Sequence, residues 1–138
     1  MKETFRKING VWTKCEGPED FRPLHHARIG REYASFILAG RANVTVGAET
    51  FDMQVRDSDI SRLDGAIRYN ELSGVTEMYL TDADNVNHYG VSLADAKLVL
   101  AEMMRVAYEA HALKQQARAL IAQAATVEEM EAVTFGTV

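Results

Sequence analysis

Histidine and cysteine, the residue types most suited to metal binding and nucleophilic catalysis, are sparse in this sequence. His25 and His26 are adjacent, and adjacent side chains on a helix point about 100° apart, so the pair does not chelate one metal ion. No HExxH, CxxC or His-x-His spacing occurs. The single cysteine, Cys15, stands beside Lys14 but has no Cys-His-Asn or Cys-x-x-Cys context for an activated thiol. We therefore predict packed or solvated histidines, no metal and no cofactor.

Two short acidic clusters resemble the start of a calcium-binding loop, Asp57-Ser58-Asp59 and Asp82-Ala83-Asp84-Asn85. Each lacks the glycine at the sixth position and the glutamate at the twelfth that complete the calcium ligands, so turn and helix-cap roles explain them better. Glu128, Glu129 and Glu131 can act as acid and base only if the fold buries them close together. A solvated acidic face is the simpler interpretation. We expect no catalytic residues and no enzyme.

Aromatic residues and methionines leave two interpretations open. The aromatic side chains fall on predicted strands and helix faces, where a hydrophobic core uses them, although some can form a ligand platform. Met103 and Met104 either fill the core or form an adaptable surface for a partner, since unbranched thioethers fit irregular gaps.

The composition is that of one soluble domain: 138 residues, 15.4 kDa and 47% hydrophobic residues. A chain of this length buries a core without a metal or a disulfide, and the lone cysteine excludes a disulfide scaffold and favours a reducing compartment. The net charge of −5 argues against nucleic acid and anionic membranes as partners. The sequence has no recognisable signal peptide and no apolar run long enough to span a bilayer, so neither export nor a membrane span is expected.

Turn and helix signals organise the first third of the chain. β-Favouring residues flank Asn9-Gly10, the dipeptide best suited to a tight turn, so residues 3–14 are predicted to form a hairpin. Residues 16–20 combine helix breakers with acids and are expected to form a loop. A helix is predicted from about Leu24 to Ala39, docking on a sheet through residues 33–38.

Two hairpins, each followed by a helix, are predicted in the middle of the chain. Alternating apolar residues indicate the first hairpin over residues 43–54, and Asp57 or Ser58 can cap the helix that follows. The second hairpin spans residues 76–91, and Ser92 caps the next helix. The shared order is a weak structural repeat and does not indicate a solenoid.

From Ser92 to about Ala125 the sequence lacks Pro and Gly and is rich in helix formers, so one long helix is predicted. Such a helix approaches about 50 Å, more than the body of a domain of this size, so its distal half is expected to pack on another copy or another protein. A break near residues 111–116, folding the chain back as a helical hairpin, is the alternative. Apolar residues recur along it in steps of four and three, the pattern of a coiled-coil seam, at Val99, Met103, Val106, Ala110, Leu113, Ala117, Leu120, Ala124 and Val127.

These elements predict an α+β fold: an N-terminal β-hairpin, then a helix-hairpin-helix-hairpin head and a long C-terminal α-helix with heptad character. Thr126, with Glu129 three residues later, forms a capping box and predicts a last short helix over residues 127–132. We expect a single domain over residues 1–138, comprising an opening hairpin (1–21), an α+β head (22–91) and the long helix plus the short terminal helix (92–133).

Four phrases of the sequence carry a resemblance to a known family. They are Ala39–Val46 (AGRANVTV), Phe51-Asp52, Leu93-Ala94 and, most distinctively, Ala119–Val133 (ALIAQAATVEEMEAV). With these phrases, residues 31–133 resemble a family of short proteins and protein C-termini encoded by tailed bacteriophages and prophages, the domain of unknown function numbered four-three-seven-six. The resemblance does not extend to the opening hairpin.

Genes of that family tend to lie beside tail-fibre genes, so the resemblance implies a tail-associated part or a tail-fibre assembly factor, and it implies no catalytic residues. We expect a phage or prophage tail-associated protein-interaction protein, either a tail-fibre assembly chaperone or a minor tail structural component. It would work in the host cytoplasm during assembly or in the virion tail. The expected partners are further copies of the chain in a homo-oligomer, a phage tail-fibre protein, or both.

The residues expected to make these contacts lie on the seam of the long helix. Replacing Leu113 with Asp is expected to abolish association and leave the head folded. The set comprises Val99, Met103, Val106, Ala110, Leu113, Ala117 and Leu120.

Two other functions remain open at this point. A small phage inhibitor of a host enzyme or defence complex would act through an acidic surface that mimics nucleic acid, and it predicts a contiguous acidic face on the head. A small enzyme would require a concave pocket with close carboxylates or histidines, which nothing in the sequence indicates.

Overall fold

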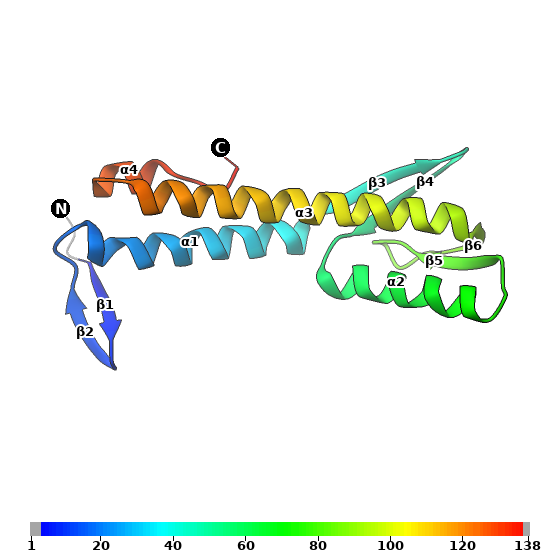
Figure 1. Cartoon of the computed structure of the whole chain (residues 1–138), viewed down its shortest axis with the longest axis horizontal. Coiled ribbons are helices and arrows are strands. Elements are labelled where there is room, and N and C mark those ends of the chain that lie inside the picture. The colour runs from blue at the N-terminus through cyan, green and yellow to red at the C-terminus, as the bar shows by residue number, and fades with distance from the viewer. Residues whose placement is uncertain (1–3, 137–138) are drawn as a thin grey trace. The chain divides into compact units, whose positions relative to one another are not determined.

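The computed structural model describes residues 4–136 and has an α+β architecture (Figure 1). Within that range, six strands form three separate two-stranded antiparallel sheets, and four helices accompany them. In chain order the elements are β1 (Phe5–Ile8), β2 (Val11–Lys14), α1 (Pro18–Ala39), β3 (Arg41–Val46), β4 (Glu49–Gln54), α2 (Asp57–Leu72), β5 (Glu77–Thr81), β6 (Asn87–Ser92), α3 (Leu93–Gln123) and α4 (Val127–Ala132).

The chain divides into two compact units. The first unit comprises Met1–Ala34 and His111–Val138, and the second comprises Ser35–Ala110. Each unit has a hydrophobic core of its own. The first unit combines segments from both ends of the chain, so the division does not follow chain order. The single domain expected from the sequence stays a prediction.

All three predicted hairpins are confirmed over the described residues; Glu3, the first residue of the predicted opening hairpin, lies outside them. The β1–β2 turn places Asn9 at φ 49° and Gly10 at φ 84°, the positive angles that its Asn-Gly dipeptide favours. The β3–β4 turn places Gly47 at φ 62°, and the β5–β6 connection places Asn85 at the same value. Local turn chemistry therefore fixes the position of each hairpin along the chain.

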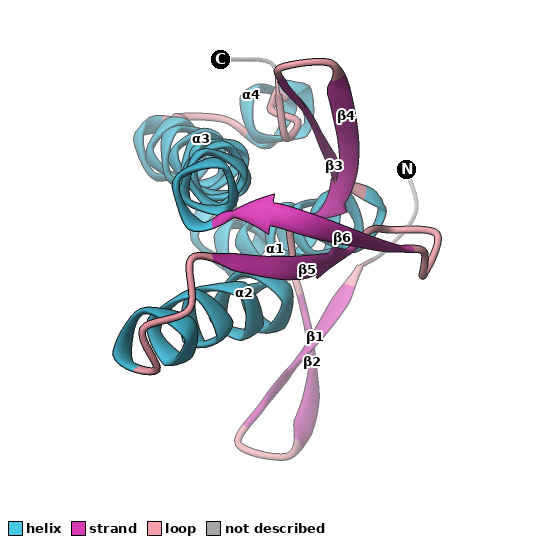
Figure 2. Ribbon diagram, turned by 90° about the vertical axis from the view of Figure 1, so that its right-hand side faces the viewer, coloured by secondary structure: helices cyan, strands magenta, loops and turns pink. Residues whose placement is uncertain are grey.

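The second unit is built around the core shared by its two hairpins and two helices. Val44 of β3 lies opposite Phe51 of β4, and Ala42 lies opposite Met53, and these four side chains alternate inward along their strands. Figure 2 shows β5 lying between β6 and α2. β5 pairs with β6 and is in contact with α2. The remaining buried core residues are Val55, Leu63, Ile67, Met78, Leu80, Val91, Ala96, Val99, Leu100 and Met103.

Helix α1 begins earlier than the sequence predicted. The expected loop over residues 16–20 is wrong from Pro18 onward, because Pro18 is the first helical residue and Glu19 and Asp20 lie in the first turn. Proline is favoured at that position, where its missing N–H would have no intrahelical partner, and acids there oppose the positive end of the helix dipole. Pro23 therefore lies inside the helix rather than at its start.

The expected docking of α1 on a sheet through residues 33–38 is also wrong. Tyr33 lies in the first unit, where its ring makes edge contacts with His111 and Phe135 at centroid distances of 6.3 and 6.0 Å. The ammonium of Lys114 lies 4.7 Å from the centre of the same ring. Ile29 is the fully buried residue of this helix, so the helix packs through its middle.

Helix α3 is continuous over 31 residues, which confirms the long helix and excludes the predicted alternative of a break. Ser92 caps it as predicted, because the backbone N–H of Asp95 donates to the Ser92 hydroxyl oxygen at 3.1 Å. The expectation that the distal half needs another molecule to cover it is wrong. Ala117 and Ile121 are fully buried against Ile29 and Met130 in the first unit.

Helix α1 itself is the cover that this expectation missed. Its 22 residues are long enough to lie beside the C-terminal end of α3 (Figure 1), and the two helices share the first unit's core. The predicted cap of α4 is confirmed, since the Thr126 hydroxyl accepts from the backbone N–H of Glu129 at 3.2 Å. None of the helices within residues 4–136 combines the length and apolar character needed to cross a membrane.

Candidate protein-interaction surfaces

Most of the seam predicted on α3 packs within the chain itself. Val99 and Met103 belong to the core of the second unit, and Val106 packs against that core. Ala117 belongs to the core of the first unit, and Ala110 is buried. Leu113 is half-buried, as Val106 is, but it belongs to neither core, and Leu120 is 43% exposed, so these two are the predicted contact residues left for another molecule.

The two methionines that the sequence left undecided have different roles. Met103 is 1% exposed in the second unit's core, whereas Met104 is 51% exposed on another side of α3, where Leu98 and Tyr108 are also exposed. Arg105 lies within this surface and pairs with Glu102 and Glu109, and these hydrogen bonds raise the pKa of the Arg105 guanidinium. The exposed side of α3 is therefore mixed, with apolar side chains around an ion-pair network.

The β1–β2 hairpin is the least covered element of the first unit. Trp12 is 68% exposed, Val11 64% and Phe5 47%. The cross-strand pairs place Phe5 and Trp12 on one face and Ile8 and Val11 on the other, so both faces carry uncovered apolar side chains. Arg6 makes a 3.4 Å ion pair with Asp20 of α1.

Charge distinguishes this hairpin from the rest of the chain. Residues 1–15 contain four basic residues and one acidic residue, and residues 16–138 contain eleven basic and nineteen acidic. The strands themselves carry Arg6, Lys7 and Lys14 and no acid. The hairpin is thus a cationic, partly aromatic arm on an acidic protein.

In the second unit, a groove of about 710 Å³ lies between α2 and β5, and we call it the α2–β5 groove. Every residue of β5 lines it, both the buried Met78 and Leu80 and the exposed Glu77, Tyr79 and Thr81. Successive side chains of a strand point to opposite faces, so a cavity lined by all of them follows the edge of the strand. That edge is unpaired, because β5 pairs only with β6 among the described strands.

One face of α2 forms the opposite wall of the groove. Its lining residues recur at helical spacing, with Leu63 buried and Tyr69 70% exposed at the rim. Met53 and Met103 complete an apolar floor. The α2 wall consists of Asp59, Arg62, Leu63, Ala66, Tyr69 and Asn70.

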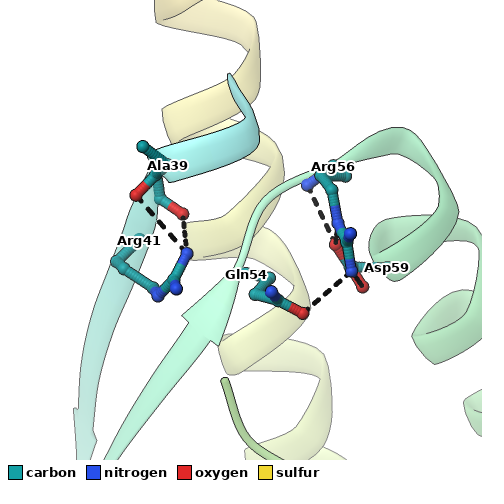
Figure 3. Close-up of polar contacts among 6 residues, drawn as sticks. Ala39, Arg41, Gln54, Arg56 and Asp59 are labelled. Atoms are coloured by element: carbon teal, nitrogen blue, oxygen red, sulfur yellow. Dashed lines mark hydrogen bonds and ion pairs between the residues drawn. The ribbon is translucent and has the colours of Figure 1, made fainter. Parts of the chain in front are cut away.

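Arg56 holds one end of the groove in place. Its guanidinium donates to Gln54 Oε1 at 2.9 Å and to both oxygens of Asp59, the shorter contact being 2.8 Å (Figure 3). The hydrogen bond from Arg56 lowers the pKa of Asp59. Asp59 also accepts from the backbone N–H of Arg56, so Arg56 is the residue at the N-cap position.

This geometry corrects the predicted cap at Asp57 or Ser58. Asp57 is the first helical residue of α2, and the carboxylate of Asp59 reaches back to the preceding backbone instead. In the same view, Arg41 at the start of β3 donates to the backbone oxygens of Ala39 and Gly40 after α1 (Figure 3).

Asp82 also lines the groove, in the turn that follows β5. Its Oδ1 accepts from the backbone N–H groups of Asp84 and Val86 at 2.9 Å each, which confirms the predicted turn role of this cluster. Its Oδ2 lies 2.8 Å from Nε2 of His88, and this contact, with the backbone bonds, lowers the pKa of Asp82. The His88 ring meets the buried Phe51 edge-on, at a centroid distance of 5.0 Å.

The first unit has a hollow of its own, of about 1030 Å³, beside the start of α1. Phe21 and Val127 contribute apolar surface, and Glu16, Glu128 and Glu131 contribute carboxylates. Glu128 and Glu131 belong to the acidic group that we predicted to form a solvated face, and both are exposed.

His25 and His26 lie on α1 in the first unit, and burial lowers the pKa of both imidazoles. Among residues 4–136, no three His, Cys, Asp or Glu side chains gather closely enough to hold a metal ion.

The sequence did not single out the hairpin or the α2–β5 groove as binding surfaces. For the hairpin a signal exists: apolar residues occupy both alternating sets of positions, whereas a strand with one solvated face alternates apolar and polar. For the groove no local signal exists, because its walls come from segments that only the fold brings together.

Comparison of the chain with protein-family models, with curated proteins and with solved structures finds no match.

Proposed function

We propose that this protein is a phage or prophage tail-associated protein that acts by binding other proteins, with tail-fibre assembly chaperone as its specific role. Its partners are further copies of the chain and a tail-fibre protein, and it acts in the host cytoplasm during assembly without catalysis of its own. The resemblance of residues 31–133 to a phage family supports the tail assignment. The geometry supports the binding role.

The observation that carries the binding role is the uncovered β1–β2 hairpin. A two-stranded hairpin alone is marginally stable in water, and its strands present unpaired edges. Here Trp12, Val11 and Phe5 also remain exposed, which leaves apolar area that a partner can bury. Tryptophan is among the residues that contribute most when buried at a protein interface.

The seven-residue pattern of α3 has a smaller part in this proposal. Val99, Met103 and Ala117 are occupied in the chain's own cores, so an association through the predicted seam has Leu113 and Leu120 as its contact residues. The hairpin offers more exposed apolar surface than these two residues do.

The test is co-expression of this chain with a phage tail-fibre protein, the partner class proposed above. We expect the two proteins to co-purify, and we expect the soluble yield of the fibre protein to rise when this chain is present. Trp12→Ala should lower the fraction of co-purified fibre at least about tenfold, as for the loss of a central interface aromatic residue.

Tyr108→Ala is the matched control, since Tyr108 is an equally exposed aromatic residue on α3, at 76%. It should leave co-purification unchanged. A fibre protein that is equally soluble without this chain and does not co-purify with it would overturn the assembly role, and equal effects of the two variants would remove the hairpin as its site.

A further inference from the structure

Residues 127–135, which comprise α4 and the segment that follows it, form what we call the C-terminal strap. The guanidinium of Arg28 on α1 donates from Nη2 to two backbone oxygens of the strap, those of Met130 and Val133, at 3.2 and 2.6 Å. The side chain of Met130 is fully buried in the core of the first unit, which also contains Ile29. Arg28 therefore secures the part of the strap that completes this core.

Glu32 extends the attachment toward the end of the strap. Arg28 donates from Nη1 to Glu32 Oε1 at 3.0 Å, and Glu32 Oε2 accepts from the backbone N–H of Phe135 at 2.9 Å. The ring of Phe135 also meets that of Tyr33 edge-on, at a centroid distance of 6.0 Å. The polar attachment of the strap to α1 therefore centres on the Arg28–Glu32 pair.

His25 makes a further contact with Arg28, and this contact requires a neutral imidazole. Nε of Arg28 donates to Nδ1 of His25 at 3.2 Å. A neutral imidazole accepts at one ring nitrogen, so its proton is here on Nε2, whereas a protonated imidazole carries N–H at both nitrogens and accepts at neither. Because Arg28 does not release its proton, protonation of His25 replaces the hydrogen bond with two N–H groups and two positive charges that face each other.

The surroundings of His25 make its protonation costly. Burial is the largest cause that lowers the pKa of the imidazole, followed by the charge of Arg28, and the neighbouring His26 acts in the same direction. Glu131 of α4 opposes them and raises the pKa. The net result is a pKa below the ordinary histidine value, so the carboxylate of Glu131 does not offset burial and the guanidinium.

We infer that His25 and Arg28 form an acid-sensitive switch, in which protonation of His25 weakens the hold of Arg28 on the C-terminal strap and allows the strap to open away from α1. Whichever of the two side chains withdraws, the closed arrangement loses free energy relative to an open one in which the imidazolium is hydrated. This switch is independent of the proposed function, because it involves only contacts within the first unit.

The direction of the pH dependence follows from linkage between protonation and opening. A base whose pKa is lower in the closed state than in the open state binds its proton mainly after opening. The closed strap is therefore favoured above about pH 6.5 and loses this advantage as the pH falls through the pKa of His25 in the closed chain. Opening would uncover the apolar core of the first unit in acid and not at neutral pH.

Hydrogen exchange of the full chain, followed by NMR at about pH 7.5 and about pH 5, tests this switch. The amide groups of Met130, Val133 and Phe135 donate hydrogen bonds in the closed strap. After correction for the intrinsic effect of pH on exchange, we expect their protection to fall about tenfold at the lower pH, as for the loss of one hydrogen bond to a charged group. β3 and β4 of the second unit should keep their protection. Equal protection of the strap at both pH values would overturn the inference.

His25→Asn is the decisive variant, because the amide oxygen can accept from Nε of Arg28 and takes up no proton in this range. Its strap should be equally protected at both pH values. His26→Asn is the matched control, since His26 is also half-buried but the cations that act on it are Arg118 of α3 and Arg22 of α1. It should retain the fall in protection. A fall that persists in His25→Asn overturns the inference, and so does one that disappears only in His26→Asn.

Arg28→Ala keeps the inference testable if His25→Asn disturbs α1. Without the guanidinium, the strap should already be open at neutral pH, so acid should lower its protection no further. The pKa of His25, followed through its imidazole NMR signals, should rise toward the ordinary value. A strap that is as well protected as in the unmodified chain at neutral pH, and that opens as fully in acid, would show that Arg28 is not part of the switch.

Discussion

The carboxylate of Asp82 joins the end of β5 to β6. It accepts hydrogen bonds from the backbone N–H groups of Asp84 and Val86, and it contacts the ring of His88. These bonds, the one to His88 first, lower its pKa below the ordinary carboxyl value. Because the pKa is lower in the folded chain than in the unfolded chain, the charged carboxylate stabilises the fold at neutral pH. That contribution is lost as the pH falls below about 3.9 toward the folded pKa.

Asp82→Asn keeps an oxygen for the two N–H donors but has no charge to lose. We expect the free energy of unfolding of the unmodified chain to fall more steeply than that of the variant between about pH 5 and pH 2. Urea melts across this range measure the difference. Asp84→Asn, at the exposed neighbouring position, should follow the unmodified chain. Three parallel curves would show that the charge of Asp82 contributes nothing to the pH dependence of stability.

At this scale the sequence predicted well wherever the cause is local. Asn9-Gly10 adopts its turn, and Ser92 and Thr126 cap their helices, because each depends on the conformation of a few neighbouring residues. The start of α2 was placed wrongly by one or two residues. There the carboxylate of Asp59 competes with that of Asp57, and sequence alone does not decide between them.

Helices α1 and α3 are joined by a clamp that no sequence pattern indicated. Arg22 donates from Nη1 to the backbone oxygens of Ile121, Ala122 and Ala124, at 2.8, 3.1 and 2.9 Å. These oxygens lie at the end of α3, where carbonyl groups lack helical partners and the dipole favours a cation. Arg22 thereby serves as a C-cap supplied by another helix.

Arg22→Ala should lower the free energy of unfolding by about 2 kcal/mol, because it leaves these oxygens without a charged donor. Arg22→Lys should recover less than half of the loss, since an ammonium does not reproduce the planar fork of the guanidinium. Denaturant unfolding measures both. Arg31→Ala, at an exposed position of the same helix, is the control and should change stability by less than about 0.5 kcal/mol. A loss no greater than that of the control would show that water replaces the clamp.

The periodicity of α3 predicted a stripe that must be covered, and Val99, Met103 and Ala117 are covered. The pattern did not indicate by what. Heptad spacing reports which side of a helix is apolar, and the same spacing suits a second copy or another helix of the same chain. The cover for the distal half includes Ile29, which lies inside the helix that the sequence predicted, so the missing information was the pairing of α1 with α3.

At the scale of the whole molecule, the chain has two cores rather than one. The core of the second unit is formed from residues 42–103, whereas that of the first unit combines Ile29 with residues 117–130. Sequence analysis assigned the strands and helices of both. It did not predict this division, because the first core pairs segments about ninety residues apart, and no local pattern encodes such a pairing.

Because the two cores are separate, we expect a substitution in one core to destabilise mainly the unit that contains it. Ile121 is 0% exposed in the first unit's core, and Leu80 is 1% exposed in the second unit's core. Replacing either with Ala removes buried methyl groups and leaves a cavity, at a cost of about 2 to 5 kcal/mol. Local opening lowers hydrogen-exchange protection first in the region that has lost its packing.

We therefore expect Ile121→Ala to speed amide exchange in α4 and in α1 near Ile29, while β3 and β4 keep their protection. Leu80→Ala should have the reverse effect. Hydrogen exchange read by mass spectrometry on peptides from each segment separates the two patterns. If both variants speed exchange equally in all these segments, the two cores unfold as one cooperative unit, and the continuous helices α1 and α3 would then be the elements that couple them.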